Sequence, residues 1–274
     1  MIQQFMDGFS LGGLFLLTLA LMLGFVEAGF RLGSRQQDKA AKQQASQVRG
    51  VMGAMLGLTA FMLAFTFASA QGHHEQRIVN MVAEAGLLSD AFMQTEFLDE
   101  PARTEARGLL HQYVTGRLQI IELARARKAT EAIALIKKAE MLQLELWEIA
   151  AAAHRDLPGQ SQRGAPFAST VQGIINMHAV RLQGALMNRI SWAVWATLYL
   201  TGFMGMLVMG YQAGLSTRRS PLATATLAVA FSTVMMLIVD LDRPMMSLFQ
   251  INDQVMIDLE QRMQGILSVN DGGD

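Results

Sequence analysis

The chain has 274 residues, of which 51% are hydrophobic and only 16% are charged, and its formal net charge is -1. Soluble domains carry about 25% charged residues and nucleic-acid-binding domains are usually basic on one face, so the composition fits neither class and predicts no nucleic-acid partner. Because the chain contains no cysteine, disulfides, thiolate catalysis and cysteine-bound metals are excluded.

The apolar residues gather into four long runs, at about residues 9–30, 50–70, 190–211 and 222–239. Each run is about 18 residues or longer, which at about 1.5 Å of helix per residue is enough to cross a hydrocarbon core about 30 Å thick. Soluble helices rarely extend so far without a charged face. We therefore predict an all-α, polytopic membrane protein whose four transmembrane helices contact the lipid bilayer.

The short loops that follow the first and third runs are basic. Their positive residues are Arg31, Arg35, Lys39, Lys42 and Arg49 in the first loop, and Arg218 and Arg219 in the second. Short basic loops usually stay on the cytoplasmic side of a membrane. We therefore expect both termini, and the long segment between the second and third runs, to lie outside.

The segment between the second and third runs has the pattern of amphipathic helices. From Ile78 to Phe92, apolar residues recur at helical spacing, so the second span is expected to continue beyond the membrane. Further helices are expected from Pro101 to about Arg127, from Thr130 onwards, and from about Pro166 into the third span, with a turn at residues 157–161. The expected insert is an extramembrane four-helix domain continuous with spans two and three.

These patterns divide the chain into four segments. Residues 1–71 hold spans one and two, residues 72–189 the helical insert, residues 190–244 spans three and four, and residues 245–274 a tail. Within the tail, residues 254–266 have the spacing of a short amphipathic helix, which would lie either along the membrane or against the insert.

The second span is uncharged and combines small residues with aromatic ones. Small residues allow two helices to pack closely, which is one interpretation of the pattern. The other is a pore-lining helix of a homo-oligomer, in which apolar rings gate the passage of a small ion by dewetting. The candidate pore-lining residues are Gly57, Phe61, Phe65, Thr66 and Ser69.

No pattern of catalytic or metal-binding residues is recognisable. The five histidines include no pair at metalloprotease spacing, and His178 stands on an apolar stripe, where a histidine is usually a core residue. Neither a nucleophile–base pair nor a phosphate-binding loop is apparent. We therefore expect no catalytic residue, no metal and no cofactor, and a protein that is not an enzyme.

Several stretches together resemble a known family. They are Leu63–Ala70, Arg77, Glu84-Ala85, Leu98, Pro101, Arg103, Arg107, Tyr113, Arg117 and Asp240-Leu241-Asp242-Arg243-Pro244, with Glu27, Gly29 and Gly33 at the end of the first span. This pattern is similar to the bacterial bestrophin-like membrane protein family and covers nearly the whole chain. One departure is Gly86, which stands where the family has an asparagine after Glu-Ala.

The resemblance implies a bacterial plasma (inner) membrane protein with a distant kinship to bestrophins, which are homopentameric anion channels with four spans and an apolar neck. Bestrophin helical domains are cytoplasmic, whereas the basic loops of this chain favour an insert on the outside. We keep the orientation that the loop charges predict, with the termini and helical domain periplasmic and the short basic loops cytoplasmic.

Ionisable residues near the span ends are candidates for structural ion pairs. Glu27 stands one helical turn before Arg31, which favours a pair between them. Arg77 lies just beyond span two, and we expect it to pair with Asp240 or Asp242, so that Arg77→Ala lowers thermal stability or impairs assembly. The remaining candidates are Glu84 and Arg243.

Two functions fit these patterns. The first is a homo-oligomeric membrane channel that conducts ions, with anions favoured by the resemblance, and whose second span lines the pore. The second is a non-conducting membrane scaffold or sensor whose helical domain binds a ligand or a partner protein. A ring of subunits would favour the channel, whereas a monomer would favour the scaffold or sensor.

Overall fold

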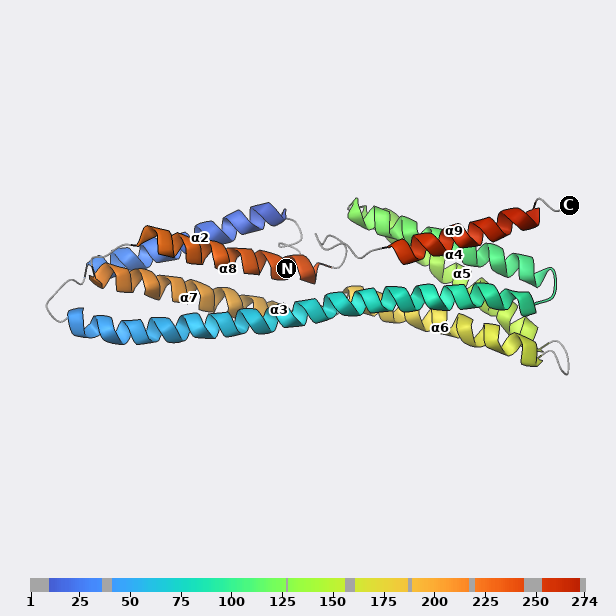
Figure 1. Ribbon diagram of the computed structural model, residues 1–274, viewed down its shortest axis with the longest axis horizontal. Coiled ribbons are helices and arrows are strands. Elements are labelled where there is room, and N and C mark those ends of the chain that lie inside the picture. Colours follow the sequence, from blue (N-terminus) through green and yellow to red (C-terminus); the bar gives the residue numbers. More distant parts are fainter. Residues whose placement is uncertain are drawn as a thin grey trace. The chain divides into compact units, whose positions relative to one another are not determined.

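The computed structural model describes residues 10–35, 41–126, 128–155, 161–186, 189–216, 220–243 and 253–271. Within these ranges the chain is helical and contains no β-strand (Figure 1). The helices are α2 (Leu11–Ser34), α3 (Ala41–Gln94), the 3-10 helix η1 (Thr95–Phe97), α4 (Ala102–Arg125), α5 (Ala129–Arg155), α6 (Ser161–Leu186), α7 (Trp192–Ser216), α8 (Pro221–Asp242) and α9 (Gln254–Asp271). Residues 157–160 of the turn predicted at 157–161 lie outside the described ranges, as do Lys39, Arg218, Arg219 and Pro244. The last residue of that turn, Ser161, begins α6.

Four of these helices are long and apolar enough to cross a membrane: α2, the apolar part of α3, α7 and α8. The prediction of an all-helical chain with four candidate spans is therefore confirmed. Local signals fit the helix starts. The Ser10 hydroxyl accepts a hydrogen bond from the Gly13 N–H at 3.1 Å and so caps α2. Pro221, whose ring fixes a helical φ, opens α8.

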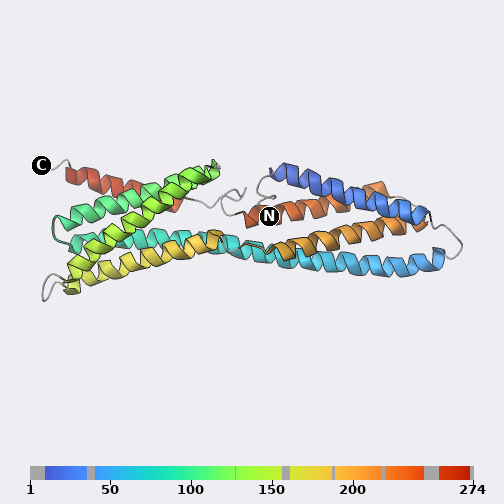
Figure 2. The same cartoon turned by 180° about the vertical axis from the view of Figure 1, so that it is seen from behind.

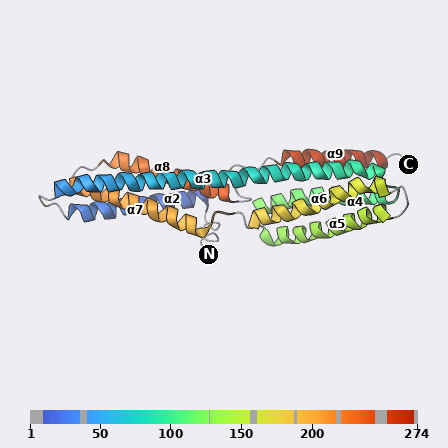
Figure 3. The same ribbon diagram turned by 90° about the horizontal axis from the view of Figure 1, so that it is seen from below.

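The chain folds into two compact units. One comprises residues 1–74 and 189–243 and is called the membrane unit; the other comprises residues 75–188 and 244–274 and is called the helical domain. The helix α3 contributes its first part to the membrane unit and its last part to the helical domain. Figure 3 shows the helices of each unit from below.

In the membrane unit, α2 packs very closely against α7. Gly29 and Gly33 of α2 face Gly210 and Gly214 of α7, and a Cβ atom added at any of the four would clash with the backbone of the opposite helix. The carbonyl oxygens that these Cβ atoms would meet belong to Leu207, Tyr211, Val26 and Phe30, in that order. This is the small-residue contact by which membrane helices approach each other, here with a four-residue repeat on both partners.

The helical domain surrounds its own apolar core, to which α4, α5 and α6 contribute together with the last part of α3. The C-terminal helix α9 lies along α4 (Figure 2), where Met256, Leu259 and Met263 are buried in that core. An ion pair of 2.5 Å between Arg125 Nη2 and Asp253 Oδ2 adds to the contact. Of the two placements considered for the tail helix, the one against the insert is therefore the one observed.

One helix boundary differs from the prediction. The last helix of the insert was expected to run into the third span, but α6 ends at Leu186 and α7 begins at Trp192. Between them, the Ile190 N–H donates to Asp242 Oδ1 at 2.9 Å, and Arg189 Nε lies 3.5 Å from Asp242 Oδ2. The Asp242 carboxylate at the end of α8 thus accepts a hydrogen bond from a backbone N–H that would bond within the helix if α6 and α7 were continuous. The periodicity of the sequence does not reveal this contact.

Candidate functional site: a buried polar network around Glu84

Polar and charged side chains from four helices meet inside the helical domain. Glu84 comes from α3 and is completely buried, as is Tyr113 from α4, while Arg117 of α4 is only 4% exposed. The other members are Gln143 of α5 and His178 and Arg181 of α6. These side chains stand on helix faces that are otherwise apolar, so each helix directs its polar residue into the core.

Glu84 is the acceptor at the centre of the network. Arg117 donates to it through two nitrogens, Nε to Oε1 at 3.2 Å and Nη2 to Oε2 at 3.4 Å. Arg181 also donates to Oε1, as does the Tyr113 hydroxyl at 3.2 Å. A buried carboxylate therefore has charge-assisted hydrogen bonds from two guanidinium groups, the arrangement that offsets the cost of burying it.

Tyr113 and His178 extend the network to α5 and α6. The Tyr113 hydroxyl accepts a hydrogen bond from Gln143 Nε2 at 3.2 Å and lies 3.4 Å from His178 Nδ1. Arg181 Nη2 also lies 3.4 Å from this Nδ1, and a guanidinium nitrogen can only donate, so Nδ1 is the acceptor. The proton of the neutral imidazole then sits on Nε2, which is 3.9 Å from Glu140 Oε1.

Burial and the two arginines set the protonation of the network. Burial alone would raise the pKa of the Glu84 carboxyl, but Arg117 and Arg181 outweigh it and hold that pKa below its ordinary value. Burial and the Glu84 charge raise the pKa of Tyr113 to about 12. Burial, Arg181 and Arg117 lower the pKa of His178 to about 4. At neutral pH the network therefore holds one carboxylate, two guanidinium groups and a neutral imidazole.

The lowered pKa of His178 predicts that the helical domain loses stability in mild acid. An unfolded histidine takes up a proton near pH 6.5, whereas folded His178 does so only near pH 4, so stability falls as the pH drops between these values. Glu84 lowers the stability of the helical domain further only below about pH 4.5, where an unfolded glutamate becomes protonated. Between about pH 6.5 and 5, the apparent Tm of His178→Gln should therefore fall less than that of the wild type. If the apparent Tm of the two proteins fell equally over this pH range, the assignment of a neutral His178 would be wrong.

A second group of basic residues holds the turn between α3 and α4. Arg107 Nε donates to Thr95 Oγ1 at 3.0 Å, its Nη2 donates to Glu96, and its guanidinium carbon lies 5.5 Å from the centre of the Phe92 ring. Arg103 donates to the Leu98 carbonyl from Nε and Nη2, at 3.1 and 3.0 Å. These arginines therefore donate hydrogen bonds to groups between α3 and α4, where the backbone no longer bonds within a helix.

In the membrane unit, a buried charged segment ends α8. Asp240, Asp242 and Arg243 are 0%, 2% and 3% exposed, and Asp242 binds the residues before α7 as described above. Arg77 belongs to the helical domain, so its pairing with Asp240 or Asp242 stays a prediction. At the other end of the unit, Glu27 Oε1 accepts a hydrogen bond from Arg31 Nε at 2.9 Å.

Comparison with models of known protein families shows which family the chain belongs to. The family model of the Bestrophin-like domain matches residues 15–256, which include the network around Glu84 and the end of α8. The chain belongs to the bestrophin-like family. No curated protein and no solved structure matches it.

The departure from the bestrophin-like pattern at Gly86 does not touch the network. Gly86 is exposed, and a Cβ atom added to it would meet nothing within 4 Å. It lies on the side of α3 opposite to Glu84 and Leu88, which are both completely buried. An asparagine at this position would therefore project away from the core of the helical domain.

Four of the five candidate pore-lining residues in this bestrophin-like chain share an exposed strip of α3. Gly57, Phe61, Phe65 and Ser69 recur every four residues and are all exposed, Phe61 and Phe65 at 66% and 65%. Thr66 does not belong with them, because it is 1% exposed and its hydroxyl donates to the Met62 carbonyl at 2.6 Å. Its short polar side chain bonds back to its own helix on the packed face.

The sequence analysis named Glu84 but not its partner Arg181, and it treated His178 as a core histidine without naming its partners. A signal was present, because Arg117 and Arg181 continue the apolar stripes of their helices at spacings of four and three residues from Tyr113 and His178. Two arginines on core faces require a buried acid. Among the described residues, no three histidine, aspartate or glutamate side chains are placed to hold a metal ion.

Proposed function

We propose that this bestrophin-like protein is a homo-oligomeric membrane channel that conducts anions and whose pore is lined by α3. Family membership supports the channel class, and the kinship with bestrophins favours anions. We assign the Glu84 network a structural role in the helical domain rather than a catalytic one, because it contains no nucleophile activated by a base.

The observation that carries the proposal is the exposed strip of Gly57, Phe61, Phe65 and Ser69 on α3. It contains no charge, and its two phenylalanines turn away from the core of their own unit. In a ring of subunits, such strips would surround a common axis, and rings of phenylalanine would form an apolar constriction that opens by wetting.

The proposal is tested by oligomeric state and conductance together. We expect the protein purified in detergent to form a closed ring of identical subunits by native mass spectrometry, and to give anion-selective currents in planar bilayers. A monomer, or a ring that gives no current over a range of voltages, salts and divalent ions, would rule the channel out.

We also propose that the protein lies in a bacterial inner membrane with its termini and helical domain in the periplasm, as the basic loops predict. Cysteines introduced at Ser46 and Ser161 report the two sides of the membrane in the otherwise cysteine-free chain. A membrane-impermeant thiol reagent applied to intact spheroplasts should label Ser161→Cys and not Ser46→Cys. The reverse labelling would invert the topology.

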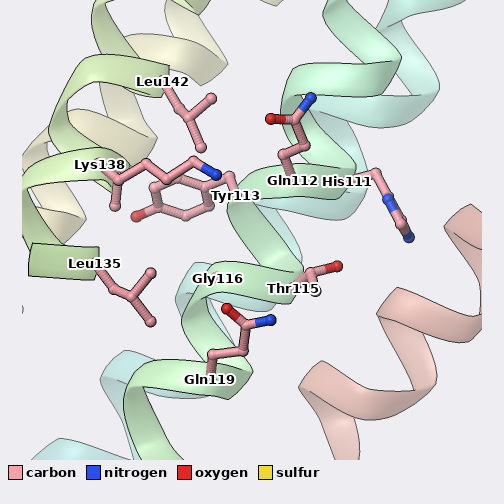
Figure 4. A pocket seen from close by; sticks show the side chains of 10 residues that line it. His111, Gln112, Tyr113, Thr115, Gly116, Gln119, Leu135, Lys138 and Leu142 are labelled. Carbon is pink, nitrogen blue, oxygen red and sulfur yellow. The ribbon is translucent and has the colours of Figure 1, made fainter. Parts of the chain in front are cut away.

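A second candidate function is a sensor whose helical domain binds a ligand. It is favoured by a hollow of about 230 Å³ between α4 and α5 (Figure 4). This candidate predicts specific binding of a small molecule by a protein that gives no current, and a chain that binds no small molecule in this hollow would contradict it.

A further inference from the structure

The part of α3 that belongs to the helical domain is apolar on two opposite sides. Its inner side packs into the core of that domain, where Leu88 and Phe92 are buried. Its outer side carries Val79, Val82 and Met93, which are 59%, 50% and 67% exposed. A surface helix of a globular domain normally has one apolar stripe, which faces the core. The outer side of α3 is therefore apolar surface that the helical domain leaves uncovered.

The spacing on the outer side is that of a helix that packs against another helix. Val79, Val82, Gly86, Ser89 and Met93, which we call the outer stripe, follow one another at alternating steps of three and four residues. This is the heptad spacing of a coiled coil, in which the first and fourth positions of every seven face the partner. A glycine inside a helix is destabilising, and at Gly86 an added Cβ atom would meet nothing within 4 Å, so the fold of the subunit does not require it. Close approach of a partner helix would use this small residue.

The register of the outer stripe continues back along α3. Counting in sevens, Phe65 lies two heptads before Val79, and Phe61 lies three heptads before Val82. Of the register positions from Phe61 to Met93, only Glu75 is charged. Because α3 is a single helix of 54 residues, one heptad register includes both the outer stripe and the exposed phenylalanines of the proposed pore.

Direction and charge favour a second copy of this chain as the partner. Copies of a membrane protein share one orientation, so their α3 helices run parallel and symmetry sets each residue against its own counterpart. A charge in such a contact would face a like charge, which is unfavourable. The outer stripe has no charge, and the exposed acid Asp90 lies just outside its register. An identical helix therefore fits the stripe in direction, register and charge.

We propose that the outer stripe is the surface through which the helical domains of neighbouring copies pack, α3 against α3, parallel and in register. Removal of exposed valine and methionine side chains from water supplies the driving force, as for other exposed apolar patches that bind a partner. This contact rests on the homo-oligomer proposed above, and it names the surface that joins the helical domains of that oligomer.

Oxidative cross-linking in native membranes tests the contact, because the chain has no cysteine of its own. A disulfide requires two Cα atoms within about 7 Å of each other. We expect copper phenanthroline to convert most of the Val82→Cys protein into a covalent dimer, in which mass spectrometry identifies a peptide that joins position 82 of both copies. Val180→Cys is the matched control and should not be cross-linked, since Val180 is a valine of α6 that is 47% exposed and lies outside the stripe.

A charge introduced into the stripe provides a second measurement. Val79→Cys, in the same register, should also form the dimer, and Val82→Asp in the same chain should slow that reaction at least about tenfold, because like charges then face each other. Val180→Asp in the Val79→Cys chain should leave the rate unchanged. Val82 and Val180 are both exposed, so neither aspartate should alter the helical circular dichroism.

Three results would overturn the proposal. They are a Val82→Cys protein that dimerises no faster than Val180→Cys, a Val82→Cys protein that is cross-linked to a different protein, and a Val79→Cys dimer that forms as fast with Val82→Asp as without it. The failure of this contact and the failure of the channel are distinguishable by conductance. Copies that cross-link in register but give no current would exclude the channel and keep the contact, whereas a conducting ring without the Val82→Cys dimer would exclude the contact alone.

Discussion

Gly29→Ala should destabilise the membrane unit by about 3 kcal/mol, because its added Cβ meets backbone rather than a movable side chain. The Leu207 carbonyl oxygen lies where the methyl group would go, so α2 and α7 have to move apart. The separation would also loosen the contacts of Gly33 and Gly214 further along the same two helices. The expected result is a large fall in apparent Tm in detergent.

Gly24→Ala provides the matched control for this experiment. Gly24 lies on the same helix as Gly29, and a Cβ atom added to it meets nothing within 4 Å. The control should leave stability unchanged or raise it by up to about 1 kcal/mol, because alanine is the better helix former. If both variants have the same Tm as the wild type, the close α2–α7 contact is wrong.

Glu84→Gln should destabilise the helical domain by about 3–5 kcal/mol, although the side chain keeps its size and shape. The substitution leaves Arg117, which is 4% exposed, and Arg181 facing an amide instead of a carboxylate. The buried guanidinium of Arg117 and the partly buried guanidinium of Arg181 then lack a counter-charge, and the Tyr113 hydroxyl loses a charged acceptor. Thermal unfolding and limited proteolysis of the helical domain would measure the loss.

A double variant and a surface variant make the Glu84 experiment specific. Glu84→Gln combined with Arg181→Gln should recover part of the lost stability, because one uncompensated charge remains instead of two. Glu145→Gln, on an exposed position of α5, should change stability by less than about 0.5 kcal/mol. A Glu84→Gln protein as stable as the Glu145→Gln protein would show that the network does not hold the four helices together.

The four candidate spans were predictable from sequence because lipid imposes a strong and local requirement on a helix that crosses it. A helix that crosses hydrocarbon must be about 20 residues long and nearly free of charge, and both properties are visible in a single run of residues. The individual helices of the insert were predictable for a similar reason, since each shows its own apolar stripe. Both requirements act within one helix, so no knowledge of the partner helices is needed.

The partners of Glu84 were not predictable in this way. Arg117 and Arg181 are 33 and 97 residues away from Glu84 along the chain, and the contact depends on how three helices pack. The break between α6 and α7 depends in the same way on Asp242, which is 52 residues from Ile190. Periodicity reports which face of a helix is buried, but it does not report which buried residues meet.

The most direct test of the channel proposal uses the absence of native cysteine in the chain. Single cysteines at Phe61 and Phe65, and at Leu200 on an exposed position of α7, are treated with a negatively charged methanethiosulfonate while the bilayer current is recorded. A pore lined by α3 predicts irreversible loss of current for Phe61→Cys and Phe65→Cys and an unchanged current for Leu200→Cys. Currents through Phe61→Cys and Phe65→Cys that resist the reagent, while Leu200→Cys is blocked, would contradict a pore lined by α3.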